Sequence, residues 1–172
     1  MKFKLLAVAV FSMIHLCGLS PLINRILFML EVPTEDENQE IQAERTVIEF
    51  YRLLNQGYYV EAAVIYGGSY DVLQGYNPDL DPEDKAGLLE AGCRFNGLMC
   101  LEVLSIELDQ SNAQGSDIYH VVFANPDGSP FMLGPCCGET EETMPPISVF
   151  PVQVKCEPAG VCRVFDLPPY VP

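Results

Sequence analysis

Residues 47–58 read VIEFYRLLNQGY, and this stretch decides the fold class. Its apolar side chains recur at the i, i+3, i+4, i+7 spacing that marks one face of an amphipathic helix: Val47, Phe50, Tyr51 and Leu54. Gly57 follows as a natural C-terminal cap. The spacing predicts a helix from about Ala43 to Gln56 that packs one side against a core.

Two more helices are expected downstream. The first carries Val60, Ala63 and Val64 on one side and ends at the glycines 67–68, and residues 70–73 add a short turn. The other begins with Asp81 as N-cap and Pro82 at the first helical position. It has Ala86, Leu89 and Cys93 on one stripe and ends near residues 96–97.

After Cys100 the apolar period changes from that of a helix to that of a strand. Strands are expected at 103–109, 118–123 and 131–133, followed by a hairpin of 147–156 and 161–167. The first should turn Leu104, Ile106 and Leu108 towards the core, and Pro151 indicates an edge or a bulge. Helices followed by an antiparallel meander predict an α+β fold, with three N-terminal helices packed on a curved antiparallel sheet.

The N-terminal residues 1–30 have the pattern of an export segment. Lys2 and Lys4 precede an apolar run from Leu5 to Ile23, which is about the length that spans a bilayer. We expect a single uncleaved membrane anchor with the domain outside the cytoplasm, and the alternative is a signal sequence that is removed to secrete the domain. Residues 31–42 are interpreted as an acidic linker and residues 43–172 as the exported domain.

The charge balance excludes one class of partner. The formal net charge is -15, with only 9 Lys and Arg, so a phosphate-binding surface for nucleic acid is not expected. The membrane is the expected partner of the N-terminal segment, and an unknown protein or small molecule is the expected partner of the domain. No motif indicates a cofactor or a metal ion.

The cysteines predict disulfides. The chain has 7 cysteines; Cys17 lies in the apolar segment, and the domain contains the other six: Cys93, Cys100, Cys136, Cys137, Cys156 and Cys162. An even number in an exported domain favours structural disulfides. The reversal at residues 96–97 favours the pair Cys93–Cys100, and the last hairpin favours Cys156–Cys162. The vicinal pair 136–137 is then either bonded in a strained ring or free, or one of its members captures a hairpin cysteine.

Two weaker candidate sites remain. His120, on the same strand face as Ile118 and Val122, is either a general base in a pocket or a hydrogen-bonded histidine on a sheet. The alternating polar residues of 77–83 are typical of a calcium loop, but Pro82 stands where such a loop needs glycine, and capping of the third helix explains them more simply.

The stretch 47–58, followed by EAAVIY at 61–66, resembles the first two helices of the nuclear-transport-factor-two-like (cystatin-like) superfamily. The resemblance covers residues 43–167 and implies a cone closed by a third helix and a curved sheet. That superfamily includes ketosteroid isomerase and scytalone dehydratase, whose catalytic Asp, His or Tyr lie inside the cone, and many domains without catalytic activity. His120 is the candidate that the resemblance offers for such a role.

We expect a non-enzymatic, membrane-tethered binding or interaction module outside the cytoplasm. Two alternatives stay open: a small isomerase, dehydratase or hydrolase that uses the cone cavity, and a structural accessory domain of a cell-envelope complex.

Overall fold

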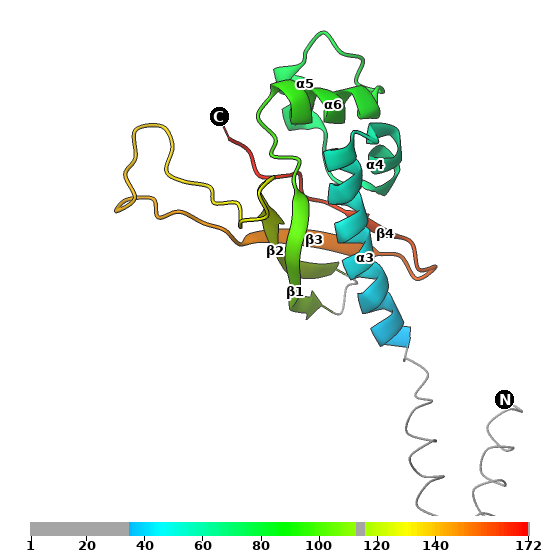
Figure 1. Ribbon diagram of the computed structural model, residues 1–172. Coiled ribbons are helices and arrows are strands. Elements are labelled where there is room, and N and C mark those ends of the chain that lie inside the picture. Colours follow the sequence, from blue (N-terminus) through cyan, green and yellow to red (C-terminus); the bar gives the residue numbers. More distant parts are fainter. Residues whose placement is uncertain (1–34, 113–115, 172) are drawn as a thin grey trace, which may run out of the picture. The chain divides into compact units, whose positions relative to one another are not determined.

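The computed structural model describes residues 35–112 and 116–171, which include one compact unit that starts at Asp36 (Figure 1). Its helices are α3 (Glu35–Gln56), α4 (Tyr59–Ile65), α5 (Asp71–Tyr76) and α6 (Lys85–Phe95). Its strands are β1 (Glu102–Asn112), β2 (Ser116–Ala124), β3 (Phe150–Cys156) and β4 (Cys162–Val164), in one antiparallel sheet of order β1-β2-β3-β4. The α+β prediction, helices first and a meander after, is confirmed.

The first helix is longer than its apolar pattern predicts. It begins at Glu35 rather than near Ala43, so the part of the expected acidic linker from Glu35 onward is helical. The reason is a contact distant in sequence: the hydroxyl of Tyr119 on β2 donates a hydrogen bond to the carbonyl oxygen of Glu40 at 3.1 Å. Exposed carboxylates also suit the first turns of a helix, where backbone N–H groups lack partners.

The inner face of the sheet differs from the predicted one at its first strand. The pairing of β1 with β2 shifts between Val103 and Ser105, which makes Leu104 the extra residue of a bulge. Val103 therefore pairs with Phe123 and packs against the core, while Leu104 is 46% exposed. The expectation that Leu104 faces the core is wrong, because the bulge resets the alternation.

Two helix details are also corrected. In α4 the buried residue is Ala62, whereas Val60 and Val64, which were expected to share the apolar side with Ala63, are 67% and 73% exposed. In α6 the N-cap is Asp84, whose carboxylate accepts the N–H of Gly87 at 2.9 Å. Asp81 instead accepts the N–H of Glu83 in the preceding turn, so its expected capping role is wrong by one turn.

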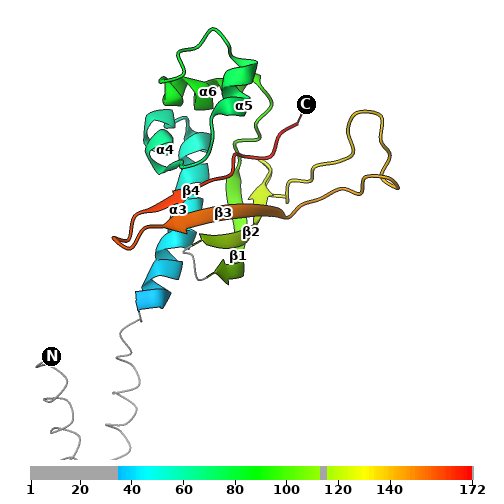
Figure 2. The same cartoon turned by 180° about the vertical axis from the view of Figure 1, so that it is seen from behind.

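The expected strand at 131–133 is not formed. Phe131 donates its N–H to the carbonyl of Phe123, and Leu133 makes an isolated bridge with Ile147. The segment between β2 and β3 is instead a long loop that projects from the sheet (Figures 1 and 2). Pro151 lies within β3 beyond the residues that β4 pairs, a stretch where its missing N–H costs no ladder bond to β4.

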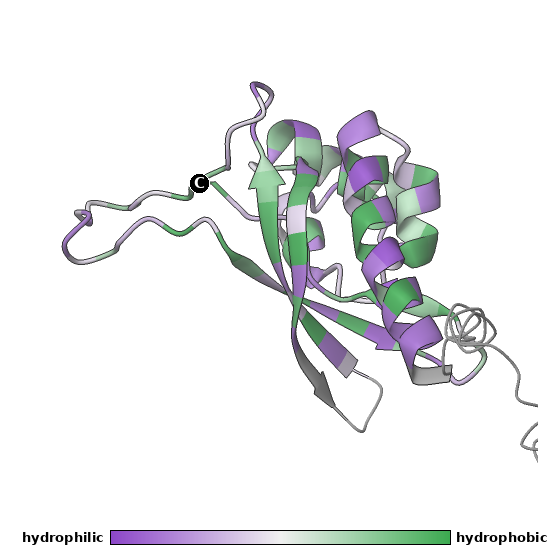
Figure 3. Cartoon of the chain, turned by 60° about the horizontal axis from the view of Figure 1, so that its bottom comes forward, coloured by the Kyte–Doolittle hydropathy of each residue, from purple (hydrophilic) through white to green (hydrophobic). Residues whose placement is uncertain are grey.

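Aromatic rings fill the space between α3 and the inner face of the sheet. Tyr51 of α3 meets Phe123 of β2 edge-on, with ring centroids 4.8 Å apart, and Phe123 contacts Phe150 of β3 at 5.7 Å. Tyr51 is fully buried and donates its hydroxyl to the carbonyl of Asp166 at 3.3 Å. Figure 3 shows that apolar and polar residues alternate along the strands. The space between α3 and these strands is therefore a packed core.

The expected anchor or signal, residues 1–30, lies outside the described residues. Within residues 35–112 and 116–171, no helix is both long and apolar enough to cross a bilayer.

Candidate functional site

The two disulfides that the sequence favours, each across one turn of the chain, are both formed. Cys93 at the end of α6 bonds Cys100, and Cys156 bonds Cys162 across the β3–β4 hairpin. Cys136 and Cys137 are free thiols, so capture of a hairpin cysteine by one of them is wrong. The two disulfides are compatible with a location outside the cytoplasm.

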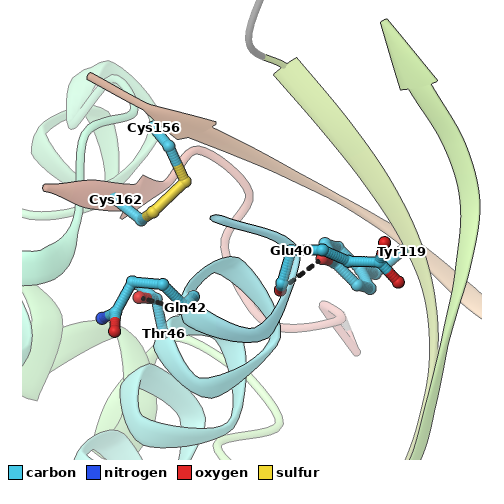
Figure 4. Close-up of a disulfide and its surroundings, with 6 residues drawn as sticks. All are labelled: Glu40, Gln42, Thr46, Tyr119, Cys156 and Cys162. Carbon is cyan, nitrogen blue, oxygen red and sulfur yellow. Dashed lines mark hydrogen bonds between the residues drawn. A yellow bond between two sulfur atoms is a disulfide. The ribbon is translucent and has the colours of Figure 1, made fainter. Parts of the chain in front are cut away.

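A groove lies where the stapled hairpin approaches α3. It has a volume of about 670 Å³ and is lined by side chains from three places: Gln42, Arg45, Thr46, Ile48 and Glu49 of α3, Ile65 at the end of α4, and residues 160–162 of the hairpin. Figure 4 shows the hairpin disulfide together with Gln42 and Thr46. Because Thr46 donates its hydroxyl to the carbonyl of Gln42 at 2.7 Å, its hydrogen bond is satisfied within the helix.

The apolar part of this hairpin groove comes from Ile48, Ile65 and Val161. Ile48 and Val161 are both substantially exposed, and the Cys156–Cys162 bond limits the movement of the hairpin beside them. A groove whose wall is covalently fixed loses little conformational entropy when it binds a ligand.

The two charged side chains of the groove, Glu49 and Arg45, differ in whether they form an ion pair. Glu49 forms an ion pair with Arg52 at 2.6 Å, and this hydrogen-bonded contact lowers the pKa of the Glu49 carboxyl. Arg45 makes no ion pair with a carboxylate of the described residues. The groove therefore combines apolar side chains with one guanidinium that can donate hydrogen bonds to an anionic group of a ligand.

A second, more polar groove of about 370 Å³ lies between the α3–α4 turn and the start of α6. Tyr58, Tyr59, Glu61 and Glu90 line it. Burial raises the pKa of the Tyr59 hydroxyl, and the nearby Glu90 adds to this. Its apolar surface is smaller than that of the hairpin groove, and a disulfide does not border it.

His120 lies on the outer face of the sheet. It pairs with Glu107 on β1 and Pro151 on β3, and its side chain is 45% exposed. A carboxylate oxygen of Asp109 lies 3.6 Å from Nε2 of His120. The residues of β2 that face the core are the alternate ones, Tyr119, Val121 and Phe123. His120 thus does not point into the packed interior, and the geometry gives it no enclosed substrate site.

The acidic stretch 77–83 is engaged in turn and helix contacts. Asn77 donates to the carbonyl of Leu73 and to the side chain of Asn96, at 2.7 and 2.8 Å. Within the described part of the chain, no three His, Cys, Asp or Glu side chains come together as a metal-ligating group.

Sequence reasoning missed the hairpin groove. Its lining residues come from positions more than a hundred residues apart. Those in the predicted helix lie outside the apolar stripe that was singled out: Arg45, Thr46, Ile48 and Glu49. The one available signal was the predicted Cys156–Cys162 pair, which fixes the hairpin but does not say which helix it approaches.

Comparison with known proteins identifies no relative: the chain matches no family model, no curated protein and no solved structure. The resemblance to the nuclear-transport-factor-two-like superfamily therefore stays a prediction.

Proposed function

We propose that the domain is a non-enzymatic binding module outside the cytoplasm, tethered to a membrane by residues 1–30, and that the hairpin groove holds an apolar peptide segment of a protein partner. The segment carries a carboxylate, from an acidic side chain or a chain end, that pairs with Arg45. The observation that carries the proposal is the groove itself: exposed Ile48 and Val161 beside a guanidinium without an ion-pair partner among the described residues.

The chemistry of the lining supports a peptide of this class. Exposed branched side chains gain free energy when apolar groups cover them, at about 25 cal/mol per Å². A carboxylate on Arg45 adds a charge-assisted hydrogen bond, which discriminates between peptides of equal apolarity. The chain's net charge of -15 opposes anions at long range, so this contact requires close fit and not steering.

Binding is tested with two labelled peptides on the full chain in lipid nanodiscs. One reads Leu-Leu-Val-Asp and the other Leu-Leu-Val-Asn, so that they differ only in the carboxylate, and fluorescence anisotropy measures their affinity. We expect the acidic peptide to bind about tenfold more tightly, a difference of about 1.4 kcal/mol.

Three variants assign the binding to the groove. Val161→Asp should abolish binding of both peptides. Arg45→Gln should lower the affinity of the acidic peptide to that of the amide peptide. Val72→Asp on α5 is the matched control, since Val72 is exposed and does not line the groove. Equal affinity of the two peptides, or binding that survives Val161→Asp, would overturn the proposal.

The tether is tested separately. Cells that express the full chain are broken, and their membranes are washed at alkaline pH. We expect the full chain to stay with the membranes, and added protease to reach the domain from the outer side only. Recovery of a shortened chain in the soluble fraction would show instead that the N-terminal segment is removed.

A further inference from the structure

The vicinal cysteines are the two thiols of the domain that the disulfides leave unused. Cys136 and Cys137 have their sulfur atoms 2.9 Å apart, and Cys137 is exposed while Cys136 is half-buried. They lie on the long loop between β2 and β3, which projects on the opposite side from the β3–β4 hairpin (Figure 2), and neither lines the hairpin groove.

A tight turn holds this pair. Glu139 donates its N–H to the carbonyl of Cys136 at 3.0 Å, and the two residues between them have positive φ angles, 62° at Cys137 and 94° at Gly138. Positive φ at both central positions is the geometry of a type I′ turn. For Cys137 this conformation is strained, and it is the only residue other than glycine with positive φ in the described ranges. Both thiols are thereby presented at one turn.

The loop is joined at its base. Leu133 and Ile147 exchange two backbone hydrogen bonds, of 2.8 and 3.0 Å, which connect its two arms. The turn is followed by an acidic run that contains Glu139, Glu141 and Glu142, and Glu139 accepts a hydrogen bond from Thr143 at 2.6 Å. The dithiol therefore stands in a negative local field.

We propose that Cys136 and Cys137 form a thiol–disulfide exchange site that reduces disulfides carried by cationic molecules and itself becomes a vicinal disulfide. The thiolate of Cys137 attacks one sulfur of the external disulfide, which forms a mixed disulfide and expels one thiolate. The thiolate of Cys136 then attacks the Cys137 sulfur and expels the second. Two protein thiols are oxidised, one external disulfide becomes two thiols, and the two protons of the cysteines pass to solvent and the leaving thiolates.

The order of attack follows from exposure. Cys137 is the accessible thiol, and Cys136 is the shielded one that resolves the mixed disulfide. The hydrogen bond with Cys137 raises the pKa of the Cys136 thiol, and the charges of Cys137 and Glu139 add to this, which favours Cys137 as the first nucleophile.

The product is readily reversed. A disulfide between adjacent residues closes a small ring that contains the planar peptide bond joining them, and this strains the ring. A strained and exposed disulfide is more easily reduced than a structural one. A mild added reductant should therefore reopen the vicinal disulfide. The disulfides Cys93–Cys100 and Cys156–Cys162, whose cysteines are half-buried or buried, should stay closed.

The test uses the full chain with Cys17→Ser, so that the vicinal pair supplies the only thiols outside the two disulfides. After mild reduction, the protein is mixed with cystamine, hydroxyethyl disulfide or oxidised glutathione, which are cationic, neutral and anionic. We expect both thiols to disappear and the mass to fall by that of two hydrogen atoms, with no adduct. At low salt, cystamine should react about tenfold faster than oxidised glutathione.

Variants separate the two roles and the effect of charge. Cys136→Ser should react quickly but stop as an adduct on Cys137, and Cys137→Ser should react slowly. Replacement of Glu139, Glu141 and Glu142 by glutamine should remove the preference for cystamine while the vicinal disulfide still forms. Stable adducts on both thiols in the parent chain, or equal rates with all three disulfides, would overturn the proposal.

Discussion

The two faces of β2 differ in what covers them, although their residues alternate along one strand. Tyr119, Val121 and Phe123 are buried against α3, while His120 is exposed and Ile118 and Val122 are half-buried on the outer side. The inner face therefore contributes stability, and the outer face contributes little. The histidine singled out from the sequence lies on the outer face, so its side chain is exposed and has no enclosed site around it.

The largest expected effect is unfolding at alkaline pH, when the buried tyrosines between α3 and the sheet ionise. Burial raises the pKa of Tyr51 and of Tyr119 above the ordinary value of 10.0, and raises the pKa of Tyr70 to about 12. The folded state thus binds these protons more tightly than the unfolded state does, so the stability they contribute is complete below pH 10.0 and is lost as pH rises above it. Phenolate absorbance and circular dichroism should show ionisation and unfolding together between about pH 10 and 12. Ionisation of all tyrosines without unfolding would show that the inner face opens to solvent.

The next effect separates neighbouring residues of the same strand. Phe123→Ala removes a buried ring that contacts Tyr51 and Phe150, and should lower the free energy of unfolding by about 3–5 kcal/mol. Val122→Ala, on the outer face, should lower it by less than about 1 kcal/mol. Urea denaturation of the two variants measures both values, and similar losses would mean that the outer face is also covered.

A smaller difference tests the bulge in β1. Ile106→Ala removes a half-buried side chain and should destabilise the protein by about 1–3 kcal/mol. Leu104→Ala changes the extra residue of the bulge and should cost about 0.5 kcal/mol or less. If Leu104→Ala proved the more damaging in thermal denaturation, the strand would follow the regular alternation that its sequence predicts.

The smallest effect concerns His120. Its contact with Asp109 spans 3.6 Å between exposed side chains, and such pairs contribute about 0–1 kcal/mol. His120→Ala should leave the unfolding free energy and the peptide affinity of the hairpin groove unchanged within about 0.5 kcal/mol. A larger loss of peptide binding would connect the outer face to the groove.

The sequence by itself determined the elements whose signals are local. The apolar spacing of Val47 to Leu54 predicts α3, and the even period after Cys100 predicts the sheet, because each depends on the few residues that make one face. The pairs Cys93–Cys100 and Cys156–Cys162 were also predictable, since each closes across one turn of chain.

Tertiary structure alone decided the rest. The start of α3 depends on a hydrogen bond from Tyr119, and the exposure of Leu104 depends on a bulge opposite β2. The hairpin groove joins Arg45 and Val161, and no local pattern encodes which surfaces meet when a chain folds. Spacing reports which side of an element is apolar, but the partner that covers that side is fixed by packing of the whole core.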